Sequence, residues 1–201
     1  MLLAADHSRP ALRRLLRQRR RALGRSQQRR AARDLYKCIA QHPLLRRARS
    51  LALYLPADGE IDPSLIRHAC WRRGIAVYLP LLADWPRTHM SFQRIERGER
   101  LRRNRFGIPE PQRNRARQRK AWTLSLLLLP LVGFDAQGGR LGMGGGFYDR
   151  ALAWRTRRPH CHSPKLIGLA HACQQVDALP LEPWDVPLEG VFTDRQFFPA
   201  R

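Results

Sequence analysis

Apolar and polar residues are distributed along the first forty residues with the spacing of two amphipathic helices. The first helix is expected to end at Gly24, and the second to begin at a Ser26 cap and to stop at Pro43. The apolar positions that share a face are Leu12, Leu15, Leu16 and Leu23 in the first helix, and Ala31, Leu35, Cys38 and Ile39 in the second.

The pattern then changes to short apolar runs separated by a helix and by loops. Residues 50–56 predict a strand, residues 58–60 a loop, and Asp62-Pro63 the start of a helix that ends before Gly74. A second strand is expected at 75–82, and this strand–helix–strand order favours a parallel pair with a right-handed crossover. Further strands are predicted at 90–95, 165–171 and 188–193.

The apolar run at 124–134 is about half as long as the ~20 residues that cross a bilayer, so it predicts a buried strand. Together the elements indicate an α/β fold: a three-layer, Rossmann-like open sheet, mostly parallel, with helices on both faces and an N-terminal helical pair. We expect one domain over residues 1–201, with flexible ends at 1–7 and 196–201.

Composition adds a strong positive charge to this picture. The 201 residues are 43% hydrophobic, as in a globular protein, and carry a formal net charge of +22. Lysine contributes only Lys37, Lys120 and Lys165, so the excess comes from arginine. Such a charge favours a polyanionic partner, but a general preference for arginine on solvated faces explains it better. The same interpretation applies to the exposed loop expected at 113–120 and to the helix positions Arg13, Arg14, Arg17, Arg19, Arg20 and Arg21.

The cysteines indicate a reducing compartment. Cys38, Cys70, Cys161 and Cys173 show no C-x-x-C spacing and follow no secretory signal, so a cytoplasmic location is expected. A transition-metal site can be imagined around His160-Cys161-His162, with His171 and Cys173. However, alternate residues on a short strand do not form a tetrahedral set unaided, and no second cluster has zinc-site spacing.

The glycine-rich stretch 138–150 follows the apolar run and precedes a helix-like pattern that begins at Ala151. Strand, glycine turn and helix present backbone N–H groups to an anion, and glycines allow the close approach. Arg140 and Arg150 bracket the loop, and Asp149 adds an oxygen ligand suited to Mg²⁺. The stretch is neither a Walker A loop nor a dinucleotide fingerprint, because the required Lys-Ser/Thr pair and third glycine are absent. A plain flexible turn is the alternative.

The same stretch resembles the signature of the 5-formyltetrahydrofolate cyclo-ligase (methenyltetrahydrofolate synthetase) family. The matching residues are Pro130-Leu131-Val132-Gly133-Phe134-Asp135 and Arg140-Leu141-Gly142-Met143-Gly144-Gly145-Gly146-Phe147-Tyr148-Asp149-Arg150. Three further segments resemble the family: Arg9-Pro10-Ala11-Leu12-Arg13, where the family usually begins with Lys; Gly107-Ile108-Pro109-Glu110-Pro111; and Asp185.

The resemblance implies an enzyme that uses ATP and Mg²⁺ to convert 5-formyltetrahydrofolate, with or without a polyglutamate chain, into 5,10-methenyltetrahydrofolate, with ADP and phosphate released. It implies catalytic roles for Arg140 and Glu60, folate contacts for Leu55, Glu60, Phe147 and Tyr148, and Mg²⁺ binding by Asp149 and Asp185. The implied ATP contacts are Arg9, Pro10, Ala11, Leu12, Arg13, Arg140, Leu141, Gly142, Met143, Gly144, Gly145, Gly146, Phe147 and Tyr148. A monomer acting on small molecules, away from membranes, is expected.

Two other functions remain open at this point. A non-catalytic RNA-binding module would use the basic helices to hold phosphate backbones, and its binding would depend steeply on salt. A sugar-phosphate isomerase or acyl-CoA transferase of similar layered fold would need no ATP.

Overall fold

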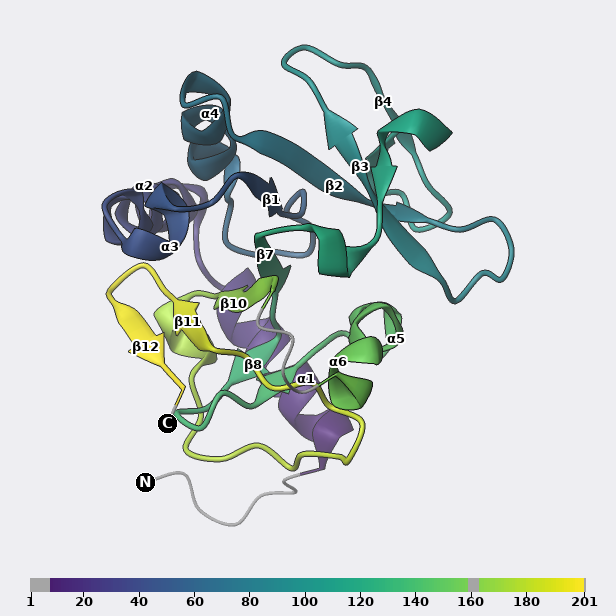
Figure 1. Ribbon diagram of the computed structural model, residues 1–201. Coiled ribbons are helices and arrows are strands. Elements are labelled where there is room, and N and C mark those ends of the chain that lie inside the picture. The colour runs from purple at the N-terminus through teal and green to yellow at the C-terminus, as the bar shows by residue number, and fades with distance from the viewer. Residues whose placement is uncertain (1–7, 159–162, 201) are drawn as a thin grey trace.

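A mostly parallel sheet forms the centre of the molecule in the computed structural model, which describes residues 8–158 and 163–200 (Figure 1). The strands are β1 (Ser50–Ala52), β2 (Ala76–Leu82), β3 (Met90–Ile95), β4 (Leu101–Arg103), β5 (Pro109–Pro111), β6 (Gln118–Arg119), β7 (Leu126–Pro130), β8 (Gly133–Phe134), β9 (Arg140–Leu141), β10 (Lys165–Leu169), β11 (Gly190–Phe192) and β12 (Phe197–Pro199).

Eight of these strands form one sheet in the order β12-β11-β10-β7-β1-β2-β3-β6. The five strands from β11 to β2 are parallel, and the three outer ones pair antiparallel. At the centre, β7 is an unbroken apolar run, as expected of a strand covered on both faces. Two small hairpins, β4-β5 and β8-β9, lie beside the sheet.

Helices cover both faces of the sheet. They are α1 (Arg9–Arg21), α2 (Arg25–Ala40), α3 (Pro43–Arg46), α4 (Ser64–Arg72), α5 (Phe147–Leu152) and α6 (Trp154–Arg157), with 3₁₀ turns η1 (Arg115–Arg117), η2 (Ala121–Thr123) and η3 (Ala172–Gln174). Side chains of α2 and α4 pack with Leu126 and Leu128 on one face. On the other face, Leu152 of α5 packs with Leu127 and Leu129. The predicted three-layer α/β fold, mostly parallel, is therefore confirmed.

Helix α1 has its own small core. Leu12 and Leu16 pack against Val132, Leu141 and Leu179, so the helix is fixed to the β8-β9 hairpin that precedes the glycine loop. This contact places helix α1 beside residues more than a hundred positions away.

The structure corrects several predicted boundaries. The N-cap of α2 is Gly24 and not Ser26, and Pro43 begins the short helix α3 after α2 has ended at Ala40. Residues 113–120 are not a plain loop, because they contain η1 and strand β6. The strand predicted at 124–134 is divided into β7 and β8. In contrast, β1 and β2 form the predicted parallel pair, and β3 has the predicted bounds.

Residues 196–201 contain a strand where the sequence predicted a flexible end. Strand β12 pairs antiparallel with β11, and the Phe197 ring lies 4.4 Å from the ring of Phe192 and 4.8 Å from that of His42. These two ring contacts hold β12 in place. The strand has only three residues, which is too few to show the alternating pattern from which a strand is predicted. Within the described part of the chain, no helix combines the length and the apolar character that crossing a bilayer requires.

The turn between β8 and β9 is built on a buried carboxylate and a glycine. Asp135 accepts hydrogen bonds from the backbone N–H groups of Gly139 (2.8 Å) and Leu179 (3.0 Å). Gly138 has φ +84°, and a Cβ there would lie 2.7 Å from the carbonyl oxygen of Leu188. The turn that leads into the glycine loop therefore requires glycine at this position.

We predict that Gly138→Ala destabilises the protein more than Gly98→Ala. Both residues have positive φ, +84° and +81°, but a Cβ at Gly98 meets no atom within 4 Å. The φ strain is common to both variants, and the contact with Leu188 should add roughly 1–3 kcal/mol to the loss at Gly138. Urea denaturation of both variants measures the difference, and equal losses would contradict the prediction.

Candidate functional site

A cavity of about 730 Å³ lies where the segments after β1 and β7 meet strand β2 and the glycine loop. Because parallel strands place their carboxyl ends at one edge of the sheet, residues from distant segments converge there. Predicted site residues that line it are Leu55, Glu60, Arg140, Gly142, Met143, Gly144, Gly145, Gly146, Phe147 and Tyr148. Glu110, from the Gly-x-x-Glu-Pro segment, also lines it.

The glycine loop connects β9 to α5. Gly144 has φ +95° and Gly146 has φ +63°, conformations that side chains with a Cβ rarely adopt. The Nε of Arg13 donates to the carbonyl oxygen of Gly142 at 2.9 Å, so α1 holds the loop from the other side. The loop is therefore a defined turn with a cationic side chain against it, and not an unconstrained glycine stretch.

Two further arginines lie beside the loop, each paired with an aspartate. Arg9 forms a two-pronged ion pair with Asp185, with N–O distances of 2.5 and 3.1 Å. Arg140, which is only 5% exposed, pairs with Asp149 and donates through Nε to the carbonyl oxygen of Val186 at 3.2 Å. The charges of these three arginines and two carboxylates, and that of Glu182 beside Arg9, are close enough to act on one another.

The pKa shifts in this cluster follow from burial and pairing. Burial opposes ionisation of Asp185, but hydrogen bonds from Arg9 and from the backbone N–H of Glu182 hold its pKa below the usual value. Burial and the neighbouring Arg9 lower the pKa of Arg13. An anion bound beside this arginine would form charge-assisted hydrogen bonds with it and stabilise its charged form.

Asp149 and Asp185 supply the oxygen donors that Mg²⁺ prefers, so their chemistry fits this ion. Each is at present neutralised by an arginine. Among residues 8–158 and 163–200, no group of three or more His, Cys, Asp or Glu side chains is arranged to hold a metal by itself. A cation held here would therefore need oxygen atoms of a ligand as well.

Glu60 is the buried carboxyl group of the cavity. Its side chain is 11% exposed, and Oε2 accepts a hydrogen bond from the backbone N–H of Ala57 at 3.1 Å. Burial raises its pKa to about 7, against the opposing effects of the Ala57 hydrogen bond and of Arg20. Burial and the nearby Glu60 also raise the pKa of Tyr148. Glu60 thus titrates near neutral pH.

Aromatic and cationic side chains surround one side of the cavity. The rings of Phe106 and Phe147 meet edge to face, with centroids 5.8 Å apart. The guanidinium carbon of Arg105 lies 5.2 Å from the Phe106 ring, and that of Arg150 lies 5.5 Å from the Phe147 ring. This arrangement provides flat apolar surfaces with positive charge close by.

Some predicted site residues lie elsewhere. The side chains of Leu12 and Leu141 are buried in the core beneath α1, and Pro10 and Ala11 form its first turn. Buried His171 contacts the carbonyl oxygen of Gly59 through Nε2 at 3.2 Å. Cys173 is a partly buried free cysteine, and the other candidate metal ligands, His160, Cys161 and His162, lie outside the described residues.

The prediction of a solvated arginine face on α1 is wrong for Arg20. Its side chain has no solvent exposure, and it bonds the loop that carries Glu60. Arg20 follows Leu12 and Leu16 at intervals of four, so the helical spacing contained the signal. The density of neighbouring arginines concealed it.

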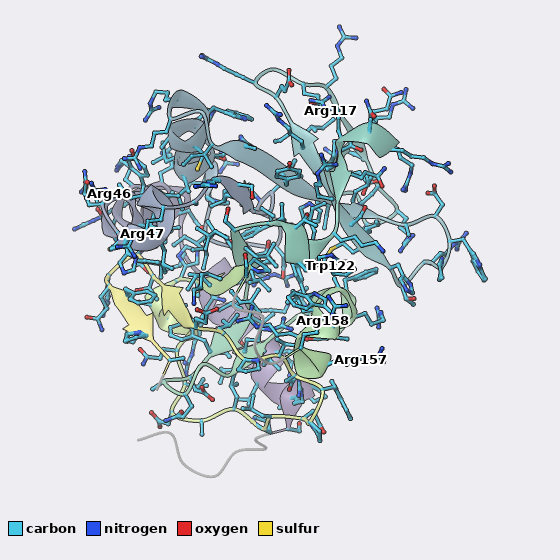
Figure 2. The ribbon with its side chains drawn as sticks, viewed as in Figure 1. Arg46, Arg47, Arg117, Trp122, Arg157 and Arg158 are labelled. Carbon is cyan, nitrogen blue, oxygen red and sulfur yellow. The ribbon has the colours of Figure 1, made fainter. Side chains whose placement is uncertain are left out.

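Other arginines do lie on the surface. Figure 2 labels Arg46 and Arg47 at the end of α3, Arg117 on η1, and Arg157 and Arg158 around the end of α6, all of which are exposed except the half-buried Arg117. In this view their side chains project outward from separate parts of the molecule. Such a distribution agrees with the interpretation of the +22 charge as mainly solvated surface.

The fold and the site define an α/β protein with a glycine loop and buried arginines beside a largely apolar cavity. Residues 5–194 match the 5-formyltetrahydrofolate cyclo-ligase family. The chain is 38% identical over 180 residues to the 5-formyltetrahydrofolate cyclo-ligase of Escherichia coli K12, covering 89% of this chain and 96% of the relative. The enzyme of that name from Haemophilus influenzae is 41% identical over 155 residues, or 75% of this chain and 80% of the relative.

Solved structures agree. The NMR structure of Aquifex aeolicus 5,10-methenyltetrahydrofolate synthetase has a TM-score of 0.80 at 25% identity, covering 96% of this chain and 93% of that one. The corresponding Mycoplasma pneumoniae protein has a TM-score of 0.70 at 25% identity, covering 94% and 99%. The chain therefore belongs to the 5-formyltetrahydrofolate cyclo-ligase family and is a ligase, which confirms the resemblance seen in the sequence.

We predict that Glu60→Gln stabilises the protein at pH 8 but not at pH 4. The folded-state pKa of about 7 lies above the ordinary value of 4.5. Ionisation therefore favours the unfolded state, and the loss of stability grows between pH 4.5 and 7 and is complete above pH 7. Replacing the carboxyl group should recover on the order of 1–3 kcal/mol at pH 8.

Urea denaturation at the two pH values measures this effect. Asp177→Asn is the matched control, because Asp177 is an exposed carboxylate and its replacement should change stability little at either pH. A Glu60→Gln effect that is the same at pH 4 and pH 8 would show that the raised pKa is absent.

Proposed function

We propose that the protein catalyses the ATP- and Mg²⁺-dependent cyclisation of 5-formyltetrahydrofolate to 5,10-methenyltetrahydrofolate, with release of ADP and phosphate. The observation that carries this proposal is the convergence of the glycine loop, Arg140 and the buried carboxyl group of Glu60 around one cavity. Arg13 contacts the loop from α1, and Arg9 on the same helix is paired with Asp185. Membership of the family, whose curated relatives bear the name of this reaction, supports it.

The reaction requires activation of a formamide oxygen, which is a poor leaving group. Transfer of the γ-phosphoryl group of ATP to that oxygen forms a P–O bond, releases ADP and leaves an iminium phosphate. The N10 amine then attacks the formyl carbon and loses its proton. The bond from this carbon to the phosphorylated oxygen breaks, and phosphate departs. No covalent intermediate with the protein is needed, so positioning and charge neutralisation are its tasks.

We assign the phosphates of ATP to the backbone of Gly142–Gly146 and to Arg9, Arg13 and Arg140. Arg13 already contacts the loop, Arg140 precedes it and is held by Asp149, and Arg9 lies on the same helix as Arg13 and is held by Asp185. Guanidinium groups bind phosphate oxygens through two parallel hydrogen bonds, as Arg9 now binds Asp185. Phosphate oxygens would therefore replace carboxylate oxygens at Arg9 and Arg140.

Asp149 and Asp185 would hold Mg²⁺ once their arginines turn to the phosphates. The ion would supply positive charge that neutralises the transferring phosphoryl group. The fit rests on these carboxylate oxygen atoms, of which Asp149 Oδ1 and both oxygens of Asp185 now accept hydrogen bonds from arginines.

The folate would occupy the apolar part of the cavity. Leu55, Phe147 and Tyr148 offer apolar and aromatic surfaces for the pteridine ring, and Glu60 offers a carboxyl group to its N–H donors. Exclusion of water by these walls protects the activated intermediate from hydrolysis.

We predict that the purified protein forms the methenyl chromophore from 5-formyltetrahydrofolate only when ATP and Mg²⁺ are both present. Absorbance spectroscopy follows the product directly, and omission of ATP or chelation of the metal should each abolish its formation. Equal turnover without nucleotide would instead support an isomerase or transferase.

We also predict that Arg140→Ala lowers turnover by roughly 10²–10³-fold, because a charged donor to the phosphates is lost in a site with little solvent. Arg14→Ala is the control, since Arg14 is an exposed residue of α1. Steady-state assays with saturating ATP measure both variants. Turnover of Arg140→Ala close to that of the control would refute the assignment of the glycine loop.

A further inference from the structure

Arg20 is the fully buried cation of α1, and its guanidinium group is bonded on all sides. Nε donates to the carbonyl oxygen of Asp58 at 2.9 Å, and Nη2 donates to the Asp58 carboxylate at 2.8 Å. Nη1 donates to the carbonyl oxygen of Leu131 at 3.0 Å, and Oε1 of Glu60 lies 3.9 Å from Nη2. One side chain thus joins the segment after β1 to the segment after β7.

These two segments line the cavity on either side of Arg20. Asp58 and Glu60 come from the first, and Leu131 from the second. Arg20 itself does not line the cavity, so it acts behind the wall and not in it. Burying an arginine has a large desolvation penalty, and an apolar side chain commonly gives equal or greater stability at such a position. The contacts made by Arg20 therefore need an explanation beyond stability.

The loop that Arg20 holds has an unusual conformation. Asp58 has φ +53°, which a residue with a Cβ adopts rarely, and the following Gly59 has φ +74°. A Cβ at Gly59 would lie 3.3 Å from the carbonyl oxygen of Arg20, so loop and helix are in close contact. Arg17 and Arg21 also pair with the Asp58 carboxylate. Although burial opposes it, these hydrogen bonds lower the pKa of Asp58 to about 2, so the pairing persists over the physiological pH range.

The conformation of this loop determines where the Glu60 carboxyl group lies. The backbone N–H of Glu60 donates to the carbonyl oxygen of Ala57 at 3.0 Å, and its Oε2 accepts from the backbone N–H of Ala57. These two hydrogen bonds close the turn between Ala57 and Glu60. Arg20 then links this turn to the segment after β7, because it bonds both Asp58 and Leu131.

We propose that Arg20, through its clamp on Asp58, is a positioning residue that presents Glu60 to the folate substrate. The inference rests on the proposed function, because it requires that Glu60 contact the folate. Arg20 touches neither substrate and acts through the loop.

The charge of Arg20 has a second effect on Glu60. The titratable groups that face Glu60 are Arg20 from α1, Asp58 from the same loop, Tyr54 after β1 and Tyr148 from α5. Arg20 lowers the pKa of Glu60, whereas Asp58 raises it. Removing the guanidinium charge should therefore move the titration of Glu60 to higher pH.

Three variants test the proposal. Arg20→Lys keeps the charge but loses the fork that reaches three acceptors, and Arg20→Gln removes the charge. Asp58→Asn weakens the clamp at a partly exposed residue, and Asn tolerates positive φ, so this variant should fold even if the Arg20 variants do not. Arg14→Lys is the matched control on the same helix, because Arg14 is exposed.

The measurements are kcat, KM for 5-formyltetrahydrofolate, KM for ATP and the melting temperature, with the folate KM determined across pH 5–9. We expect the folate KM to rise at least tenfold in Arg20→Lys and Asp58→Asn, with the ATP KM changed less than twofold. In Arg20→Gln, the pH at which the folate KM changes should also move upward. Arg14→Lys should match the wild type throughout.

A lowered melting temperature with an unchanged folate KM and pH profile would show that Arg20 is only structural and would overturn the proposal. The same holds if both substrates lose affinity equally. Failure of the proposed function is distinct: the wild-type protein would then form no methenyl product with ATP and Mg²⁺, and the inference would fail with it.

Discussion

The parallel pairing of β7 with β1 and of β1 with β2 is the constraint on which the site depends. Parallel strands end at one edge of a sheet, so the segments that follow β1 and β7 meet there although they are more than seventy residues apart. The cavity is the space left between them and the glycine loop. Without this shared edge, Glu60 and Arg140 would belong to unrelated parts of the surface.

Charge is organised at this edge quite differently from the rest of the molecule. Most of the arginines that give the protein its +22 charge are exposed on separate elements (Figure 2). Arg9, Arg13, Arg20 and Arg140 are at least partly buried, and each is bonded to a carboxylate or a backbone carbonyl oxygen. Pairing compensates these side chains for the loss of hydration and fixes the orientation of their guanidinium groups.

The sequence was sufficient for the features that depend on local pattern. Helical spacing gave α1 and α2, the strand–helix–strand order gave the parallel β1-β2 pair, and the glycine motif pointed to the loop beside the cavity. Contacts between distant residues could not be predicted in this way. Strand β12 depends on the packing of Phe197 against Phe192, and burial of Arg20 depends on a carbonyl group 111 residues away. In an arginine-rich helix, the sequence does not distinguish a buried arginine from an exposed one, because burial depends on the loop that packs against the helix.

Helix α1 connects the two halves of the site. Arg9 and Arg13 lie in its first turns, near the glycine loop, and Arg20 lies in its last turn, against the loop of Glu60. At 1.5 Å of rise per residue, Arg9 and Arg20 are separated by about 16 Å along the helix axis. This length sets the distance between the proposed phosphate-binding end and the proposed folate-binding end of the cavity. A tilt or sliding of α1 would therefore move both ends at once, which would couple the binding of the two proposed substrates through a single helix.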